Sequence, residues 1–88
     1  MSDHPTDFQG DILATIRESI VKALPDAAVE VTPGSGGHFS IVVVSKAFAG
    51  KGPVDSQRLV YSAISHLMKG DRAPVHAVDS LKTKVPAS

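Results

Sequence analysis

The 88-residue chain has no cysteine and no tryptophan, and its aromatic residues are only three phenylalanines and one tyrosine. Without cysteine, the chain forms no disulfide framework and offers no thiolate to a metal. This composition suits a reducing compartment, and we expect the cytoplasm. Any metal that the chain binds therefore needs other ligands.

An excess of charge of one sign is also missing, because nine basic residues balance nine acidic ones. Strong non-specific binding to nucleic acid usually needs a surplus of positive charge, which the whole chain lacks. No apolar run approaches the roughly 20 residues that span a bilayer, and the polar, acidic residues 1–7 do not look like a secretory signal. We therefore expect neither a membrane segment nor secretion.

The length of the chain fits one domain with a thin core. Hydrophobic residues make up 42% of the sequence, which is too many for a disordered protein. We expect a flexible N-terminal tail over residues 1–10 and a single domain over residues 11–85, because no repeat and no linker divides them.

The first half of the chain predicts a helix and then two strands. Helical periodicity begins near Asp11, which can cap the helix, and Pro25 ends it. Residues 28–32 alternate as a half-buried strand does, residues 33–37 form a glycine-rich turn, and residues 38–45 form a more apolar strand. The expected inward side chains of the helix and the second strand are Ile12, Leu13, Ile16, Ile20 and Leu24, and then Phe39, Ile41 and Val43.

The second half predicts a helix and a last strand. Asp55 or Ser56 can cap a helix that follows Pro53, and Gly70 suits its C-terminal end. Residues 75–83 form the last strand. A helical connection between the second and third strands requires a parallel pair and a right-handed crossover. The expected fold is α+β in the order α-β-β-α-α-β, with a three-stranded mixed sheet and helices on one face, which is the topology of a class II KH-like fold.

Two histidines, His38 and His76, begin the two parallel strands, and we expect them at the same edge of the sheet. Neighbouring strands lie about 5 Å apart, so long side chains from such positions can converge. Two imidazoles do not complete a metal site, and another molecule would have to supply the remaining ligands. The ordinary alternative is two strand-end histidines without a ligand role. We expect no binding role for His4 in the tail or His66 in the second helix.

Four segments of the chain, in this order and spacing, resemble the BolA-like protein family over roughly residues 11–83. They are Gly37-His38-Phe39 running into Ile41-Val42-Val43-Val44-Ser45, then Phe48-Ala49-Gly50-Lys51, then Asp55-Ser56-Gln57-Arg58-Leu59-Val60-Tyr61, and finally Val75-His76-Ala77-Val78. Where the family usually has Arg-His-Arg at the start of its central helix, this chain has Ser56-Gln57-Arg58 and keeps only Arg58.

The resemblance implies a non-enzymatic function. BolA-like proteins pair with monothiol glutaredoxins and share a [2Fe–2S] cluster with them, for cluster assembly or trafficking or for regulation by iron status. The glutaredoxin contributes one cysteine and bound glutathione contributes a second thiolate. By position, the ligands from this chain would be His76 and His38. No nucleophile elbow or Walker motif argues for an enzyme.

Two other functions stay open. A KH-like topology and a role in transcription proposed within the family, for stress or morphology responses, suggest a DNA-binding regulator. The basic residues that would support it are Lys46, Lys51, Arg58, Lys69 and Arg72. We take Gly36, Gly37, Lys51 and Arg58 as candidate contacts to a partner or to nucleic acid. Alternatively, Val42, Val44 and Val78 would leave an apolar open face that binds another protein or a second copy of the chain, giving a homodimer.

Overall fold

A computed structural model describes residues 5–70 and 73–87 of the chain. The elements follow in the order α1 (Pro5–Ala23), β1 (Ala28–Pro33), β2 (His38–Val44), η1 (Lys46–Phe48), α2 (Pro53–Ile64), η2 (Ser65–Leu67) and β3 (Ala77–Lys84), where η1 and η2 are single 3₁₀ turns. The fold is α+β, as expected, in the order α-β-β-α-β. The second helix expected after the central one is only the short turn η2, which continues directly from α2.

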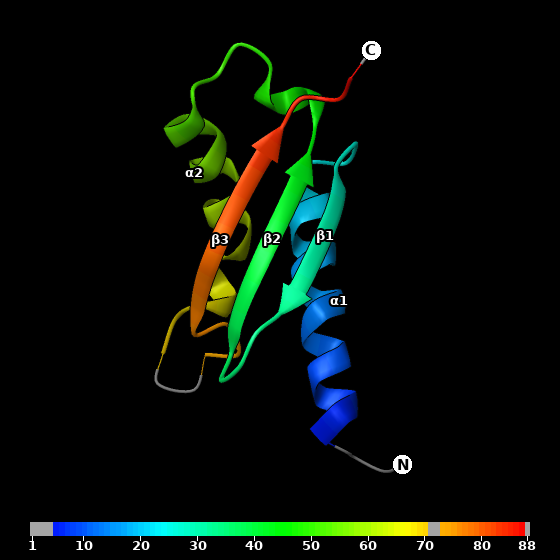
Figure 1. The fold of residues 1–88 in the computed structure, drawn as a ribbon, viewed down its shortest axis with the longest axis vertical. Coiled ribbons are helices and arrows are strands. Elements are labelled where there is room, and N and C mark those ends of the chain that lie inside the picture. The colour runs from blue at the N-terminus through cyan, green and yellow to red at the C-terminus, as the bar shows by residue number, and fades with distance from the viewer. Residues whose placement is uncertain (1–4, 71–72, 88) are drawn as a thin grey trace.

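The three strands form one mixed sheet in the order β1-β2-β3. β1 pairs with β2 in antiparallel fashion, and β2 pairs with β3 in parallel fashion. The parallel pair is the one that the helical connection predicts. Both helices lie behind the sheet in Figure 1, so one face of the sheet is covered and the other is open.

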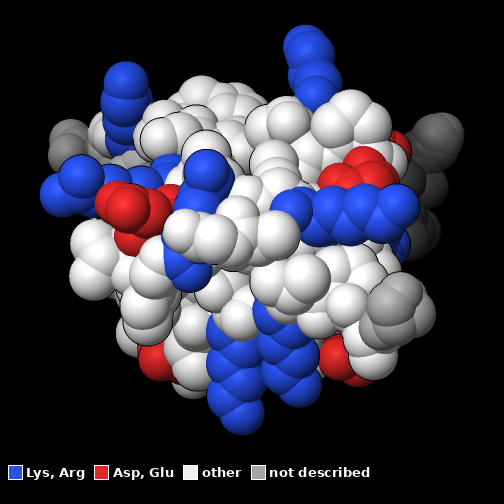
Figure 2. Space-filling view, turned by 90° about the horizontal axis from the view of Figure 1, so that it is seen from above, with Lys and Arg blue, Asp and Glu red and all other residues white. Residues whose placement is uncertain are grey.

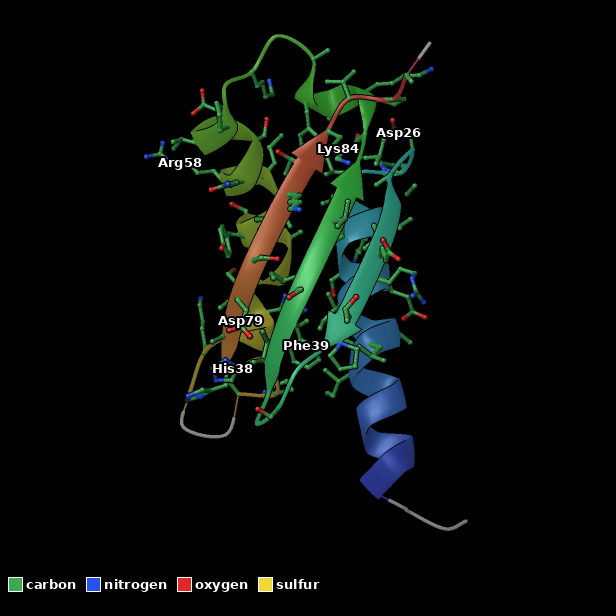
Figure 3. The ribbon with its side chains drawn as sticks, viewed as in Figure 1. Asp26, His38, Phe39, Arg58, Asp79 and Lys84 are labelled. Carbon is green, nitrogen blue, oxygen red and sulfur yellow. The ribbon has the colours of Figure 1, made fainter. Side chains whose placement is uncertain are left out.

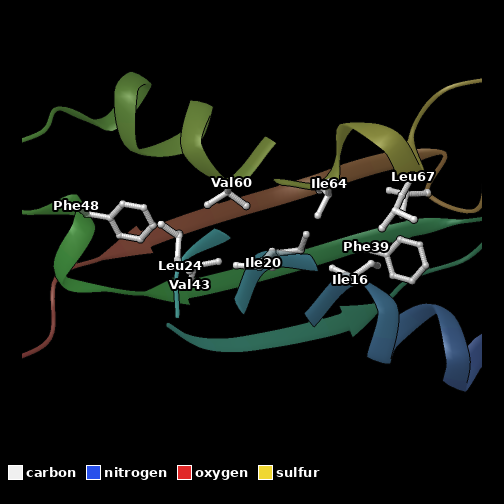
Figure 4. Close-up of a cluster of buried hydrophobic side chains, with 11 residues drawn as sticks. Ile16, Ile20, Leu24, Phe39, Val43, Phe48, Val60, Ile64 and Leu67 are labelled. Atoms are coloured by element: carbon white, nitrogen blue, oxygen red, sulfur yellow. The ribbon is translucent and has the colours of Figure 1, made fainter. Parts of the chain in front are cut away.

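The core lies between the covered face of the sheet and the two helices, as Figure 4 shows. Phe39, Ile41 and Val43 of β2 are buried, which confirms the inward face expected from their alternation. The buried hydrophobic residues are Ile16, Ile20 and Leu24 of α1, Phe39, Ile41 and Val43 of β2, Phe48, then Val60, Ile64, Leu67 and Val75.

The first helix starts earlier than the sequence predicts. α1 begins at Pro5, six residues before the helix start expected near Asp11. Proline is well tolerated at the first position of a helix, where its missing N–H would have no partner anyway. Residues 1–4, including His4, lie outside the described residues.

The start of α2 also differs from the prediction. Gly52 is the N-cap residue and Pro53 the first helical residue, so neither Asp55 nor Ser56 caps the helix. Proline again occupies the position where its fixed φ angle favours helix initiation. Asp55 then lies in the first turn, where its negative charge interacts favourably with the helix dipole, and Ser56 is buried.

None of the helices within residues 5–70 and 73–87 combines the length and the apolar character needed to cross a membrane.

Candidate metal centre

The amino-terminal ends of β2 and β3 bring His38 and His76 together. His38 is the first residue of β2, and His76 directly precedes Ala77, the first residue of β3. Because the two strands run parallel and pair His38 with Ala77, both histidines lie at one end of the sheet. Their ring centroids are 5.6 Å apart, and the ring planes are inclined by 44°. The expected convergence of the two imidazoles is therefore present, and their role as ligands stays a prediction.

The backbone of Gly37 fixes the position of His76. The Gly37 carbonyl accepts hydrogen bonds from the N–H groups of His76, at 2.8 Å, and of Ala77, at 3.2 Å. Gly37 has a φ of 79°, and a Cβ atom at this position would lie only 3.0 Å from Cβ of His76. Glycine is therefore required twice here, for the backbone conformation and for the close approach.

The residue before His76 anchors this segment in the core. Val75 is fully buried, and its N–H donates to the carbonyl of Leu67 at 3.1 Å. His76 itself is exposed. The buried Val75 and the Gly37 carbonyl together hold the His76 backbone in place while its ring remains accessible.

A tight turn places His38. The N–H of Gly34 donates to the His38 carbonyl at 2.7 Å, and the N–H of His38 donates to the Ser35 carbonyl at 3.2 Å. Gly36, inside this turn, has a φ of 64°, which favours glycine. The predicted glycine-rich turn therefore presents its residues beside the histidine pair, with Gly36 exposed and Gly37 partly buried.

A third side chain, which sequence reasoning missed, belongs to this end of the sheet. Nδ1 of His38 lies 2.8 Å from Oδ1 of Asp79, and the two side chains are 39% and 53% exposed. Figure 3 shows both residues at the same end of β2 and β3. Asp79 falls within the last strand predicted over residues 75–83, and no local pattern signals this long-range contact.

Asp79 lies at a bulge in β3. Phe39 pairs with Val78, but Ser40 pairs with Ser80, so Asp79 is an extra residue without a partner on β2. The register of β3 against β2 also corrects the expected position of Val78. This residue pairs with the buried Phe39 and packs against the core, so it does not contribute to the open face with Val42 and Val44.

The donor set fits part of an iron site rather than a whole one. Imidazole is a good ligand for iron, and two histidines bind one iron of a [2Fe–2S] centre in Rieske proteins. Within residues 5–70 and 73–87, no group of three histidine, aspartate or glutamate residues could hold a metal ion alone. A cluster at this end would therefore need thiolates from other molecules, and both histidines are exposed enough to meet them.

The remaining candidate residues do not join the histidine pair. Arg58 lies on α2 toward the opposite end of the molecule in Figure 3. Lys51 lies in the connection between η1 and α2, beside Phe48 and Val85. The predicted contact set is therefore divided between two ends of the folded molecule, with Gly36 and Gly37 at one end and Lys51 and Arg58 toward the other.

The basic residues proposed for nucleic-acid binding are also dispersed. Lys46 and Lys51 come before α2, whereas Lys69 follows η2, and Arg72 lies outside the described residues. Figure 2, which looks onto the end of the molecule opposite the histidines, shows lysine and arginine side chains in separate groups. Uncharged surface lies between these groups, and acidic side chains lie beside several of them.

His66 is exposed, as expected for a surface histidine. Its Nε2 lies 3.4 Å from the hydroxyl of Ser19 on α1. The structure places it on η2 and apart from the pair formed by His38 and His76.

The chain matches the family model described as BolA-like protein over residues 6–88. BolA-like protein 1 from Bos taurus is 36% identical to it over 87 residues, which cover 89% of this chain and 62% of that protein. The chain thus spans about three fifths of the length of the curated relatives it matches.

Solved structures show the same similarity. A bol-like protein from Babesia bovis has a TM-score of 0.71 and 35% identity, with 84% of each chain covered. The BolA domain of SufE1 from Arabidopsis thaliana has a TM-score of 0.70 and 34% identity, with 88% of this chain and 94% of that chain covered.

The fold and the site together define a small α+β domain with an accessible pair of histidines at one end of a mixed sheet. The chain belongs to the BolA-like protein family.

Proposed function

We propose that this chain is a non-enzymatic partner of a monothiol glutaredoxin, and that the two proteins share a [2Fe–2S] cluster. The observation that carries the proposal is the exposed pair of imidazoles, His38 and His76, whose rings lie 5.6 Å apart. The complex would serve cluster assembly, cluster trafficking or regulation by iron status.

The division of ligands follows from the composition of the chain. His76 and His38 would supply nitrogen ligands, and the glutaredoxin cysteine and glutathione would supply the thiolates that a chain without cysteine cannot provide. When bound, the cluster supplies one-electron redox chemistry and an inorganic core that can be passed to a recipient. Neutral imidazole in place of thiolate removes negative charge, which raises the reduction potential.

The two histidines differ in how firmly the chain places them. The backbone of His76 is held by the Gly37 carbonyl and by the buried Val75, whereas His38 borders a turn whose Gly36 is exposed. We therefore assign the more firmly placed ligand to His76 and the second ligand to His38.

The test mixes the chain with a monothiol glutaredoxin, iron, sulfide and glutathione, and records the visible circular dichroism. We expect a spectrum that differs from that of the glutaredoxin alone. The variant His76→Ala should remove this difference while its far-ultraviolet spectrum remains that of the folded chain. His66→Ala is the matched control, since His66 is an exposed histidine outside the pair, and it should keep the wild-type signal.

An unchanged visible spectrum with the wild-type chain would contradict the proposal. Equal loss of signal in the His66 and His76 variants would also contradict it, because the effect would then not be specific to the pair.

A DNA-binding regulator is the second function that the sequence suggests. Its candidate residues are divided between the turn at Gly36 and Gly37 and the distant Lys51 and Arg58, and no described surface feature favours it over the shared cluster. Binding to phosphates would show as an affinity for DNA that falls steeply with salt.

A further inference from the structure

The contact between Asp79 and His38 determines which ring nitrogen of His38 carries the proton. An ionised carboxylate accepts hydrogen bonds and donates none, so Nδ1 of His38, 2.8 Å from Oδ1 of Asp79, has to be the N–H donor. A neutral imidazole carries one N–H, and the other nitrogen keeps its lone pair. Nε2 of His38 is therefore the nitrogen that is free to bind a metal.

Asp79 lies where the pairing of β3 is irregular. Asp79 is the residue that the bulge inserts between the pairs Phe39–Val78 and Ser40–Ser80. Without the insertion, the residue after Val78 would pair with Ser40 and continue the regular ladder. The bulge frees Asp79 from the ladder, next to the first residue of β2.

Metal-binding histidines commonly donate their second ring N–H to a carboxylate, which fixes the orientation and tautomer of the ring and makes it a more basic ligand. We propose that Asp79 is a positioning residue that holds His38 with Nδ1 protonated and presents Nε2 to the shared cluster. The inference rests on the proposed function of the histidine pair, and it adds a residue that itself binds no metal.

The first measurement uses the isolated chain and needs no cluster. Long-range ¹H–¹⁵N correlation spectra, recorded at a pH where imidazole is neutral, identify the protonated nitrogen of each histidine. We expect His38 to carry its proton on Nδ1 in the wild-type chain. Asp79→Ala should shift His38 toward the Nε2–H form that imidazole side chains favour in water. Asp79→Asn should keep the wild-type tautomer, because the amide oxygen can still accept from Nδ1–H.

The second measurement follows loss of the cluster to a chelator in the complex with a monothiol glutaredoxin. Changes of such supporting residues typically lower metal affinity 10–100-fold, and we expect a loss of about this size for Asp79→Ala and a smaller one for Asp79→Asn. Asp55→Ala, at an exposed carboxylate in the first turn of α2, is the matched control and should behave as the wild-type chain.

The outcomes separate the two proposals. A wild-type complex without a shared cluster would overturn the proposed function, whatever the tautomer of His38. A wild-type complex with the cluster, together with an Asp79→Ala variant that keeps both the tautomer and the cluster, would overturn only the role of Asp79. An Nε2–H tautomer in the wild-type chain would overturn it as well.

Discussion

At the scale of single residues, Gly37 and Gly36 separate the need for a left-handed backbone conformation from the need for space beside the backbone. Both have positive φ angles, of 79° and 64°. A Cβ atom on Gly37 would lie only 3.0 Å from Cβ of His76, closer than an ordinary van der Waals contact, whereas one on Gly36 would meet nothing within 4 Å. Gly37 is therefore needed for its left-handed backbone conformation and for the close approach of His76. Gly36 is needed for its backbone conformation alone.

We therefore expect Gly37→Ala and Gly36→Ala both to lower the free energy of unfolding by about 1–2 kcal/mol, the cost of a left-handed conformation for a residue with a Cβ atom. Only Gly37→Ala should also displace His76 and weaken cluster binding in the complex. Urea denaturation measures the first effect, and visible circular dichroism with the glutaredoxin measures the second. Equal cluster binding by the two variants would show that the close approach at Gly37 does not position His76.

At the scale of elements, Asp26 connects the turn after α1 to the end of β2. Its Oδ1 accepts from the Ser45 hydroxyl at 2.7 Å, and its Oδ2 accepts from the Lys46 N–H at 2.8 Å. The Ser45 hydroxyl also accepts from the N–H of Ala47 and so caps η1. The hydrogen bond from Ser45, and then the one from Lys46, hold the pKa of Asp26 below its ordinary value.

A lowered pKa means that the ionised form of Asp26 stabilises the fold. This contribution is complete above the unfolded-state pKa of about 4 and is lost as the pH falls through the lower folded-state pKa. Asp26→Asn should therefore be less stable than the wild-type chain at pH 7, and the difference should shrink toward pH 3. Urea denaturation at the two pH values measures this. Glu30→Gln, at an exposed carboxylate of β1, is the control and should show little difference at either pH.

The element scale also shows what could be predicted from the sequence. The alternation of Phe39, Ile41 and Val43 is a local pattern with period two, and the strand obeys it. The register of β3 against β2 and the bulge at Asp79 both depend on long-range pairing, which no local pattern encodes. For this reason the sequence signals neither the inward position of Val78 nor the contact between Asp79 and His38. The start of α2 differs from the prediction because proline at the first helical position favours initiation there, and Gly52 takes the N-cap position in place of a polar side chain.

At the scale of the whole molecule, the domain depends on one thin core. Ile41 is fully buried in the middle strand, while its neighbour Val42 is half-buried on the open face. Removing a buried isoleucine side chain down to alanine costs about 2–5 kcal/mol. This is a large part of the roughly 5–15 kcal/mol by which domains are stable, and a domain of this length lies toward the lower end.

We expect Ile41→Ala to lower the free energy of unfolding by about 2–5 kcal/mol, and Val42→Ala to lower it by less than about 1 kcal/mol. Chemical denaturation of the two variants measures the difference. Similar losses would mean that the open face carries as much packing as the covered one, as it would if two copies of the chain associated through it. Sedimentation at the same concentrations distinguishes that case.

The position of the histidines could be predicted because it depends on topology. A helical connection makes β2 and β3 parallel, and parallel strands begin at the same edge, so His38 and His76 had to lie near one another. Lys51 follows the carboxyl end of β2, so the same topology places it at the opposite end of the sheet from His38. The position of Arg58 depends in addition on the direction in which α2 runs behind the sheet.

The parallel pairing of β2 and β3 also places both imidazoles at one end of the sheet, away from the middle of its open face, where Val42 and Lys82 lie on neighbouring strands. In the proposed complex, a partner bound at the histidine pair would leave that part of the open face uncovered. A second protein could then bind there before the first one dissociates.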